Sequence, residues 1–159
     1  MKRIHAIMNH DKFLDYMRKN QEYEEHRVFC HHDLSHVIDV ARIAYILCLE
    51  RRDDIPKDII YACALLHDIG RWKEYEVGLD HALISSEMAS AILADAGFKS
   101  SEIQYIQEAI KNHRNKGLHP TRLSKILYTS DKLSRPCNQC SAKPLCKRFT
   151  KSEEYYLEY

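Results

Sequence analysis

The chain has 159 residues, 45% of them hydrophobic and 30% charged, and its formal net charge is +1. These values are typical of one globular domain, and a charge so close to zero gives no general attraction for nucleic acid polymers or membranes. We therefore expect neither as a partner. No apolar run approaches the roughly 20 residues that span a bilayer, and the N-terminus lacks the apolar segment of a signal peptide. The expected location is the cytoplasm.

Helical periodicity dominates the chain. Four glycines and four prolines leave few breaks, and no stretch alternates apolar and polar residues as a half-buried strand would. Apolar residues recur instead at spacings of three and four, as in the first helix, where Phe13, Leu14 and Met17 are predicted to face inward. The fold class predicted is all-α, a bundle of at least six helices. The predicted helices span 11–25, 33–51, 54–70, 81–96, 100–113 and 121–134, with a polar loop at 71–80.

Ionisable side chains fall on the inward rows of five of these helices. They are His36, His67, Asp68, His81, His113 and Asp131. Burying any of them unpaired would cost several kcal/mol, and a divalent metal is the economical partner, because it satisfies imidazoles and carboxylates together. Six ligands exceed the three of a catalytic zinc, so the pattern predicts two metals per chain, bridged by Asp68. Iron, manganese and other first-row metals all suit such ligands.

His36, the His67–Asp68 pair and Asp131 resemble the H…HD…D signature of the HD superfamily of metal-dependent phosphohydrolases. The resemblance covers residues 28–135 and includes the segments HVIDVARIA, ALLHDIGR and TSDKLSR. His81 and His113 match the extra histidines of members that hold two metals. The arrangement is similar to that of symmetrical diadenosine tetraphosphate hydrolases and of cyclic-nucleotide phosphodiesterases. It implies a single HD domain at 1–136.

The segment FCHHDLSH resembles the YHNxxH segment of cyclic-nucleotide phosphodiesterases, whose first histidine protonates the leaving oxygen. The resemblance implies that His32 is catalytic, with His31 as its competitor, and that Asp68 is both catalytic and a ligand. The implied reaction is cleavage of a phosphoester or phosphoanhydride of a small nucleotide or dinucleotide by a metal-bound hydroxide. Two departures from the family pattern leave the substrate open. Arg71 stands where a lysine often follows the His67–Asp68 pair, and the glycine-tyrosine-proline extension of one branch is absent.

Arg71 and Arg135 are the predicted phosphate-binding residues, and Lys73 and Arg114 are further candidates. Arg135 lies one helical turn beyond Asp131, and arginine offers bidentate contact to a small anionic phosphate-containing substrate. A second enzyme class stays open. Some HD-fold proteins with the same extra histidines are di-iron oxygenases that cleave C–C or C–P bonds, and ligand identity does not separate the two.

The short C-terminal tail, 137–159, carries a C-x2-C-x5-C motif at Cys137, Cys140 and Cys146. Three cysteines are incomplete for a structural zinc site, and Cys30 is the candidate fourth ligand. A three-cysteine iron–sulfur site and a reduced, unliganded loop are the alternatives.

Overall fold

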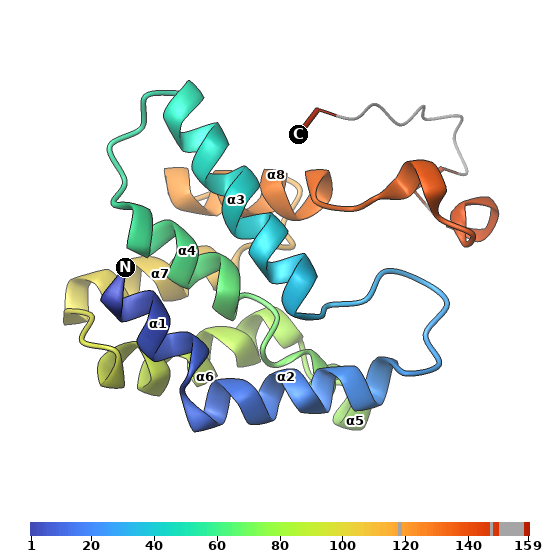
Figure 1. The fold of residues 1–159 in the computed structure, drawn as a ribbon, viewed down its shortest axis with the longest axis horizontal. Coiled ribbons are helices and arrows are strands. Elements are labelled where there is room, and N and C mark those ends of the chain that lie inside the picture. Colours follow the sequence, from blue (N-terminus) through green and yellow to red (C-terminus); the bar gives the residue numbers. More distant parts are fainter. Residues whose placement is uncertain (118, 147, 150–157) are drawn as a thin grey trace.

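The structure is a computed structural model that describes residues 1–117, 119–146, 148–149 and 158–159. These residues form α-helices and short 3-10 helices, with no strand among them, which confirms the predicted all-α class (Figure 1). In chain order the elements are α1 (Lys2–Met8), α2 (Asp11–Glu24), α3 (Leu34–Glu50), α4 (Lys57–Leu66), α5 (Arg71–Val77), α6 (His81–Asp95), α7 (Ser100–Lys111), α8 (Arg122–Leu133), η1 (Cys137–Gln139) and η2 (Lys143–Leu145).

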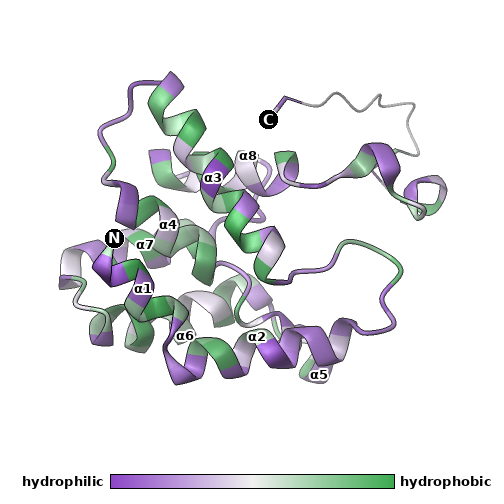
Figure 2. Cartoon of the chain, in the orientation of Figure 1, coloured by the Kyte–Doolittle hydropathy of each residue, from purple (hydrophilic) through white to green (hydrophobic). Residues whose placement is uncertain are grey.

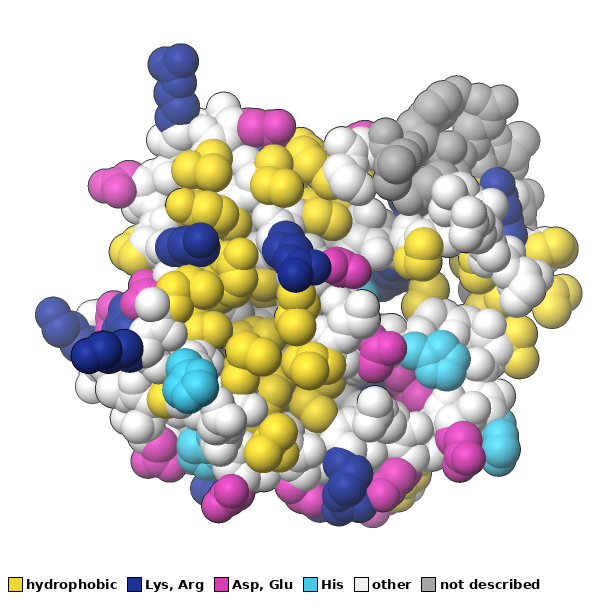
Figure 3. Space-filling view, viewed as in Figure 1, with side chains coloured by type: hydrophobic (Ala, Val, Ile, Leu, Met, Phe, Trp, Pro, Cys, Tyr) yellow, Lys and Arg dark blue, Asp and Glu magenta, His cyan; other side chains and the backbone are white. Residues whose placement is uncertain are grey.

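Helix α4 is the central element of the bundle. It packs against α1, α3, α6, α7 and α8, and every residue from Ala62 to Gly70 is buried. A helix that is apolar on all sides belongs inside a core, and the ribbons of α3 and α4 are mostly hydrophobic, whereas α2 is mixed (Figure 2). Figure 3 shows hydrophobic side chains gathered over the middle of one face, around α3 and α4. The chain segment that follows α4 therefore emerges from the centre of the molecule.

Four local features differ from what the sequence predicted. The short helix α1 was not predicted, and the expected polar loop at 71–80 contains α5, which buries only Trp72 and ends at Gly78 with a φ of 72°. The predicted helix 54–70 ends at Leu66, and the next four residues form a turn. In α2, Phe13 and Met17 are buried as predicted, but Leu14 is 52% exposed because it lies off the inward stripe.

The turn that carries the His67–Asp68 pair is clamped from two sides. From α2, the buried Asn20 donates its Nδ2 to the Asp68 carbonyl oxygen at 2.9 Å, and its Oδ1 accepts from the Trp72 amide at 2.9 Å. From α6, Ser85 Oγ accepts from the Gly70 amide at 2.9 Å. A Cβ on Gly70 would lie 2.8 Å from the Ser85 amide nitrogen, so only glycine allows this close approach.

Candidate metal centre

Two groups of buried and half-buried side chains meet around this turn. Within each group the candidate ligand atoms all lie within 4.8 Å of one another, which is close enough to hold a metal ion. Asp68 belongs to both groups. The first group is His36, His67, Asp68 and Asp131, and the second is Asp68, His81 and His113. All six predicted ligands are therefore brought together.

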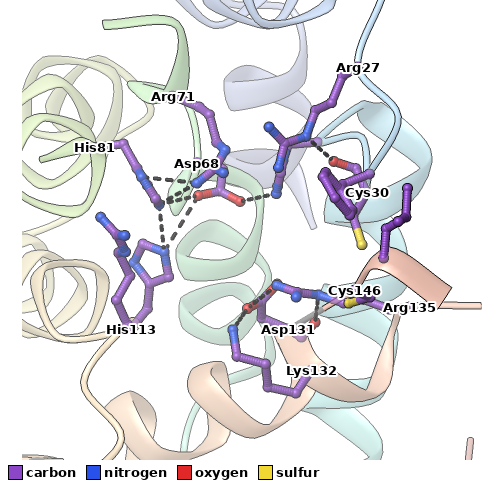
Figure 4. Close-up of a pocket in the computed structure, with 14 residues that line it drawn as sticks. Arg27, Cys30, Asp68, Arg71, His81, His113, Asp131, Lys132, Arg135 and Cys146 are labelled. Atoms are coloured by element: carbon purple, nitrogen blue, oxygen red, sulfur yellow. Dashed lines mark hydrogen bonds and ion pairs between the residues drawn. The ribbon is translucent and has the colours of Figure 1, made fainter. Parts of the chain in front are cut away.

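The two oxygen atoms of Asp68 face different histidine pairs. Oδ2 lies 3.1 Å from His67 Nε2 and 3.9 Å from His36 Nε2. Oδ1 lies 3.1 Å from His81 Nε2 and 3.5 Å from His113 Nε2, as the dashed lines of Figure 4 show. This is the arrangement that a carboxylate bridging two neighbouring cations would need.

The second nitrogen of each of three histidines is anchored to an acceptor. His67 Nδ1 lies 2.7 Å from the Ala64 carbonyl oxygen, and His113 Nδ1 lies 2.6 Å from that of Ile110. His81 Nδ1 lies 2.5 Å from Glu74 Oε2. Carbonyl and carboxylate oxygens only accept, so Nδ1 carries the hydrogen and the lone pair of Nε2 points into the centre. Outer partners of this kind orient histidines that ligate metals.

Several atoms at the centre lack a hydrogen-bond partner. Among the described residues these include His36 Nε2, His67 Nε2 and Asp68 Oδ1, all of them fully buried. A buried polar atom left unsatisfied costs about 1–3 kcal/mol, so three in one place call for a shared partner. A divalent ion fits them, because it would satisfy two imidazole nitrogens and a carboxylate oxygen together.

Electrostatics at the centre favour bound cations. Burial would raise the pKa of Asp68, but the facing imidazoles of His67 and His32 outweigh it and hold that pKa well below its usual value. Burial would likewise raise the pKa of Asp131, but the facing imidazole of His36 and the charge of Arg135 lower it well below its usual value. Both carboxylates are therefore ionised. Burial lowers the pKa of His113, which keeps that imidazole neutral and able to ligate.

The centre opens into a cavity of about 370 Å³. Asp68, His81, His113 and Asp131 form its inner side (Figure 4). Half of the remaining lining residues are cationic, namely Arg27, Arg71, Arg114, Lys132 and Arg135. Five cationic side chains thus border one cavity of an almost neutral chain, and each of them also pairs with an acidic side chain.

Both predicted phosphate-binding arginines line this cavity. Arg71 Nη1 lies 3.1 Å from His81 Nε2, and Arg135 Nη2 lies 3.0 Å from Asp131 Oδ2. Arg114 also lines the cavity, whereas Lys73 does not and pairs with Glu76. Sequence reasoning missed Arg27 and Lys132. The position of Lys132 directly after Asp131 was the available signal.

His32 is buried and lines the cavity, whereas its competitor His31 is exposed. The carboxylate of Glu24, also buried, accepts from the His32 amide at 2.7 Å and lies 2.6 Å from His32 Nδ1. It accepts as well from Tyr75 Oη at 2.7 Å. Burial would raise the pKa of Glu24, but its bonds to His32 and Tyr75 lower it to about 2. Glu24 thus holds His32 with Nε2 toward Asp68, at 3.9 Å from Oδ2. The sequence did not indicate Glu24.

An all-α bundle with buried histidine and aspartate ligands at one cavity is the architecture of the HD domain, and the HD domain family model matches residues 33–135. The chain belongs to this family. It is 35% identical, over the full length of both chains, to an uncharacterized protein of Clostridium beijerinckii. It is 33% identical over 101 residues to Ribonuclease Y of Salinispora arenicola, which matches 64% of this chain but 16% of that protein. This chain thus spans less than a fifth of the length of that Ribonuclease Y.

A solved structure extends the comparison to the fold. The crystal structure of a predicted HD superfamily hydrolase from an uncultured Thermotogales bacterium matches with a TM-score of 0.60 and 33% identity, over 76% of this chain and 65% of that one. The chain is therefore a member of a hydrolase family with residues able to hold metal. In the part that the structure describes, no helix is long and apolar enough to cross a membrane.

Proposed function

We propose that the protein is a metal-dependent phosphohydrolase that cleaves a phosphoester or phosphoanhydride of a small nucleotide or dinucleotide. The observation that carries the proposal is the cavity, in which two potential metal sites sharing Asp68 face a set of cationic side chains. That combination suits a substrate with several negative charges close to the bond that breaks. Uncharged substrates would leave Arg71 and Arg135 without an anionic partner from the ligand.

Each ligand has a place in this proposal. His36, His67, Asp68 and Asp131 would hold one divalent ion, and His81, His113 and Asp68 a second. Ions bound there would supply Lewis acidity toward the phosphoryl oxygens and a water molecule of lowered pKa. Iron and manganese both suit mixed imidazole and carboxylate ligands.

The chain's own groups bind and orient the substrate. Arg71 and Arg135 lie at the edge of the ligand cluster, where their guanidinium groups would contact phosphoryl oxygens in a fixed direction. His32 would serve the leaving group. Its Nδ1 is held by Glu24, so Nε2 is the atom that exchanges a proton with the departing oxygen. Burial lowers the pKa of His32, although Asp68 and Glu24 act against this, and an anionic oxygen beside Nε2 would favour the protonated form.

The Ribonuclease Y relatives raise RNA as a different substrate. We favour a small nucleotide because the cavity is bounded on its outer side by Leu145 and Cys146 of the tail, which narrows the path for a polymer. The formal charge of +1 also gives little non-specific attraction for a polynucleotide. A di-iron oxygenase would use the same ligands, and a phosphonate substrate of such an enzyme would also be anionic, so only the dependence of turnover on oxygen separates the two functions.

A substrate panel tests the proposal. Protein purified without oxygen and loaded with manganese or iron is offered a chromogenic phosphodiester, diadenosine tetraphosphate and a short RNA. We expect release of the chromophore from the phosphodiester or of a nucleotide product from diadenosine tetraphosphate, and loss of that activity in Asp68→Asn. Oxygen-dependent turnover with iron, without any phosphate bond cleaved, would contradict the proposal. If only the RNA is cleaved, the substrate is a polynucleotide and not a small nucleotide.

A further inference from the structure

Four cysteines come from two segments far apart in the sequence, and two of them line the outer part of the cavity. Cys30 lies in the connection between α2 and α3, and Cys137, Cys140 and Cys146 follow α8. Cys30 and Cys146 line the same cavity, and the sulfur atom of Cys30 is directed toward the tail in Figure 4. All four are free thiols. None of the four belongs to the histidine and aspartate centre.

The tail presents its three cysteines on successive turns. Cys137 begins η1, Cys140 follows it, and Cys146 follows η2. The Lys143 amide donates to the Cys140 carbonyl oxygen at 3.1 Å, and the Cys146 amide donates to that of Lys143 at 3.1 Å. Tight turns around a C-x2-C pair are the usual way in which a short segment offers thiolates to one metal ion.

Cys137 is close enough to two other cysteines to interact electrostatically with them. Burial is the main cause that raises the pKa of its thiol, and the neighbouring thiols of Cys30 and Cys140 raise it further. The charges of Arg148 and Arg135 act in the opposite direction. Cationic groups beside a cysteine cluster would offset the negative charge of thiolates bound to a divalent ion.

Packing alone gives the described part of the tail little support. Between 137 and 149, only Cys137 and Ala142 are buried among the described residues, and Leu145 is 70% exposed. The tail is held to α8 by Arg148, whose Nη1 donates to the Lys132 carbonyl oxygen at 3.2 Å. A segment with so small a core commonly depends on a disulfide or a metal for its stability. The tail nevertheless forms one wall of the cavity.

We propose that Cys30, Cys137, Cys140 and Cys146 bind one Zn²⁺ ion, which fixes the tail against the cavity. Zinc prefers four thiolates in a tetrahedron, each at about 2.3 Å. No three of these described sulfur atoms lie within 4.8 Å of one another, so the site closes by a movement of the tail that little packing opposes. The proposal is independent of the reaction at the histidine and aspartate centre.

Cobalt substitution separates this site from the centre. The full chain is purified anaerobically, stripped of metal and titrated with Co²⁺, and thiolate-to-cobalt charge-transfer absorption is recorded. Imidazole and carboxylate ligands do not give this absorption, so only the cysteines contribute. We expect one cobalt per chain with the absorption, displaced by one Zn²⁺. The signal should persist in Asp68→Ala, which disables the centre, and disappear in Cys137→Ser/Cys140→Ser.

Two further variants keep the test conclusive. Cys48→Ser is the matched control, because Cys48 lies in α3 and donates to the Asp53 carbonyl oxygen at 3.2 Å, a bond that serine can retain. It should bind cobalt like the wild type. Cys30→Ser alters only the connection before α3 and should weaken zinc binding at least tenfold without loss of helix content. The proposal is overturned if wild-type protein shows no charge-transfer absorption, if the cysteine variants keep it, or if the thiols hold an iron–sulfur cluster or a disulfide instead.

Discussion

The histidine and aspartate centre and the cysteine cluster are both candidate metal sites, but they are built in opposite ways. The ligands of the centre come from α3, α6, α8 and the ends of α4 and α7, and most of them are buried. The cysteines come from a connecting loop and from a tail with few buried residues. At the centre the ligand atoms already lie within 4.8 Å of one another, whereas no three of the described cysteine sulfurs do.

The difference shows what packing contributes to a metal site. At the centre, helix packing and outer hydrogen bonds orient each ring before any ion arrives, as at His67 and His113. At the cysteine cluster the ion itself would have to supply much of the ordering, as in small zinc-dependent modules. The two sites should therefore respond differently to mutation.

The largest effect is expected for Asp68→Asn. The amide removes the charge that faces both histidine pairs, so two ions bound there would lose their shared anionic ligand. We expect hydrolysis to fall at least about 10³-fold, with metal content reduced at the centre and helix content unchanged by circular dichroism. Cobalt binding by the cysteines should stay intact. Retained activity would mean that the site is wrongly assigned.

Glu24→Gln tests the outer support of the cavity. Glutamine keeps the shape of Glu24 but loses one acceptor and the charge that hold His32 and Tyr75. Changes to such outer partners cost about 10- to 100-fold, and we expect that loss in kcat rather than in KM. With a substrate whose leaving group needs no proton, Glu24→Gln should regain most of the wild-type rate. Equal losses for good and poor leaving groups would contradict the role given to His32.

Arg135→Gln tests the cationic lining. We expect about a tenfold increase in KM for a phosphorylated substrate, because one charge-assisted contact is lost. Lys73→Gln is the matched control, since Lys73 pairs with Glu76 outside the cavity. Its steady-state kinetics should equal those of the wild type. The cavity assignment fails if the two variants behave alike.

Gly70→Ala tests preorganisation by packing, with a smaller effect. The added methyl group would meet the backbone of Ser85 in α6, so α6 has to shift, at a cost of about 1–3 kcal/mol in unfolding free energy. Gly117→Ala, where a Cβ meets no atom within 4 Å, should be nearly neutral. Urea denaturation of both variants gives the comparison. A neutral Gly70→Ala would show that the approach of α6 to the turn is not tight.

The sequence predicted the centre better than its surroundings, for a physical reason. Helical periodicity reports which way a side chain points, so His113 and Asp131 could be placed inward beside apolar neighbours. It does not report which polar residues of an amphipathic helix become buried by a neighbour. Asn20 and Glu24 are two such polar residues of α2, because α5 and the segment around His32 cover them. Helix α5 itself was missed because its composition is polar and only Trp72 is buried.

The metal-to-protein ratio of anaerobically purified protein tests the bridging role of Asp68 most directly. With the cysteines removed by Cys137→Ser/Cys140→Ser, all bound metal belongs to the histidine and aspartate centre. We expect two ions per chain in that background, and one after the further change His113→Ala, which removes a ligand of the second group alone. A ratio of one that His113→Ala leaves unchanged would contradict a centre of two ions joined by Asp68.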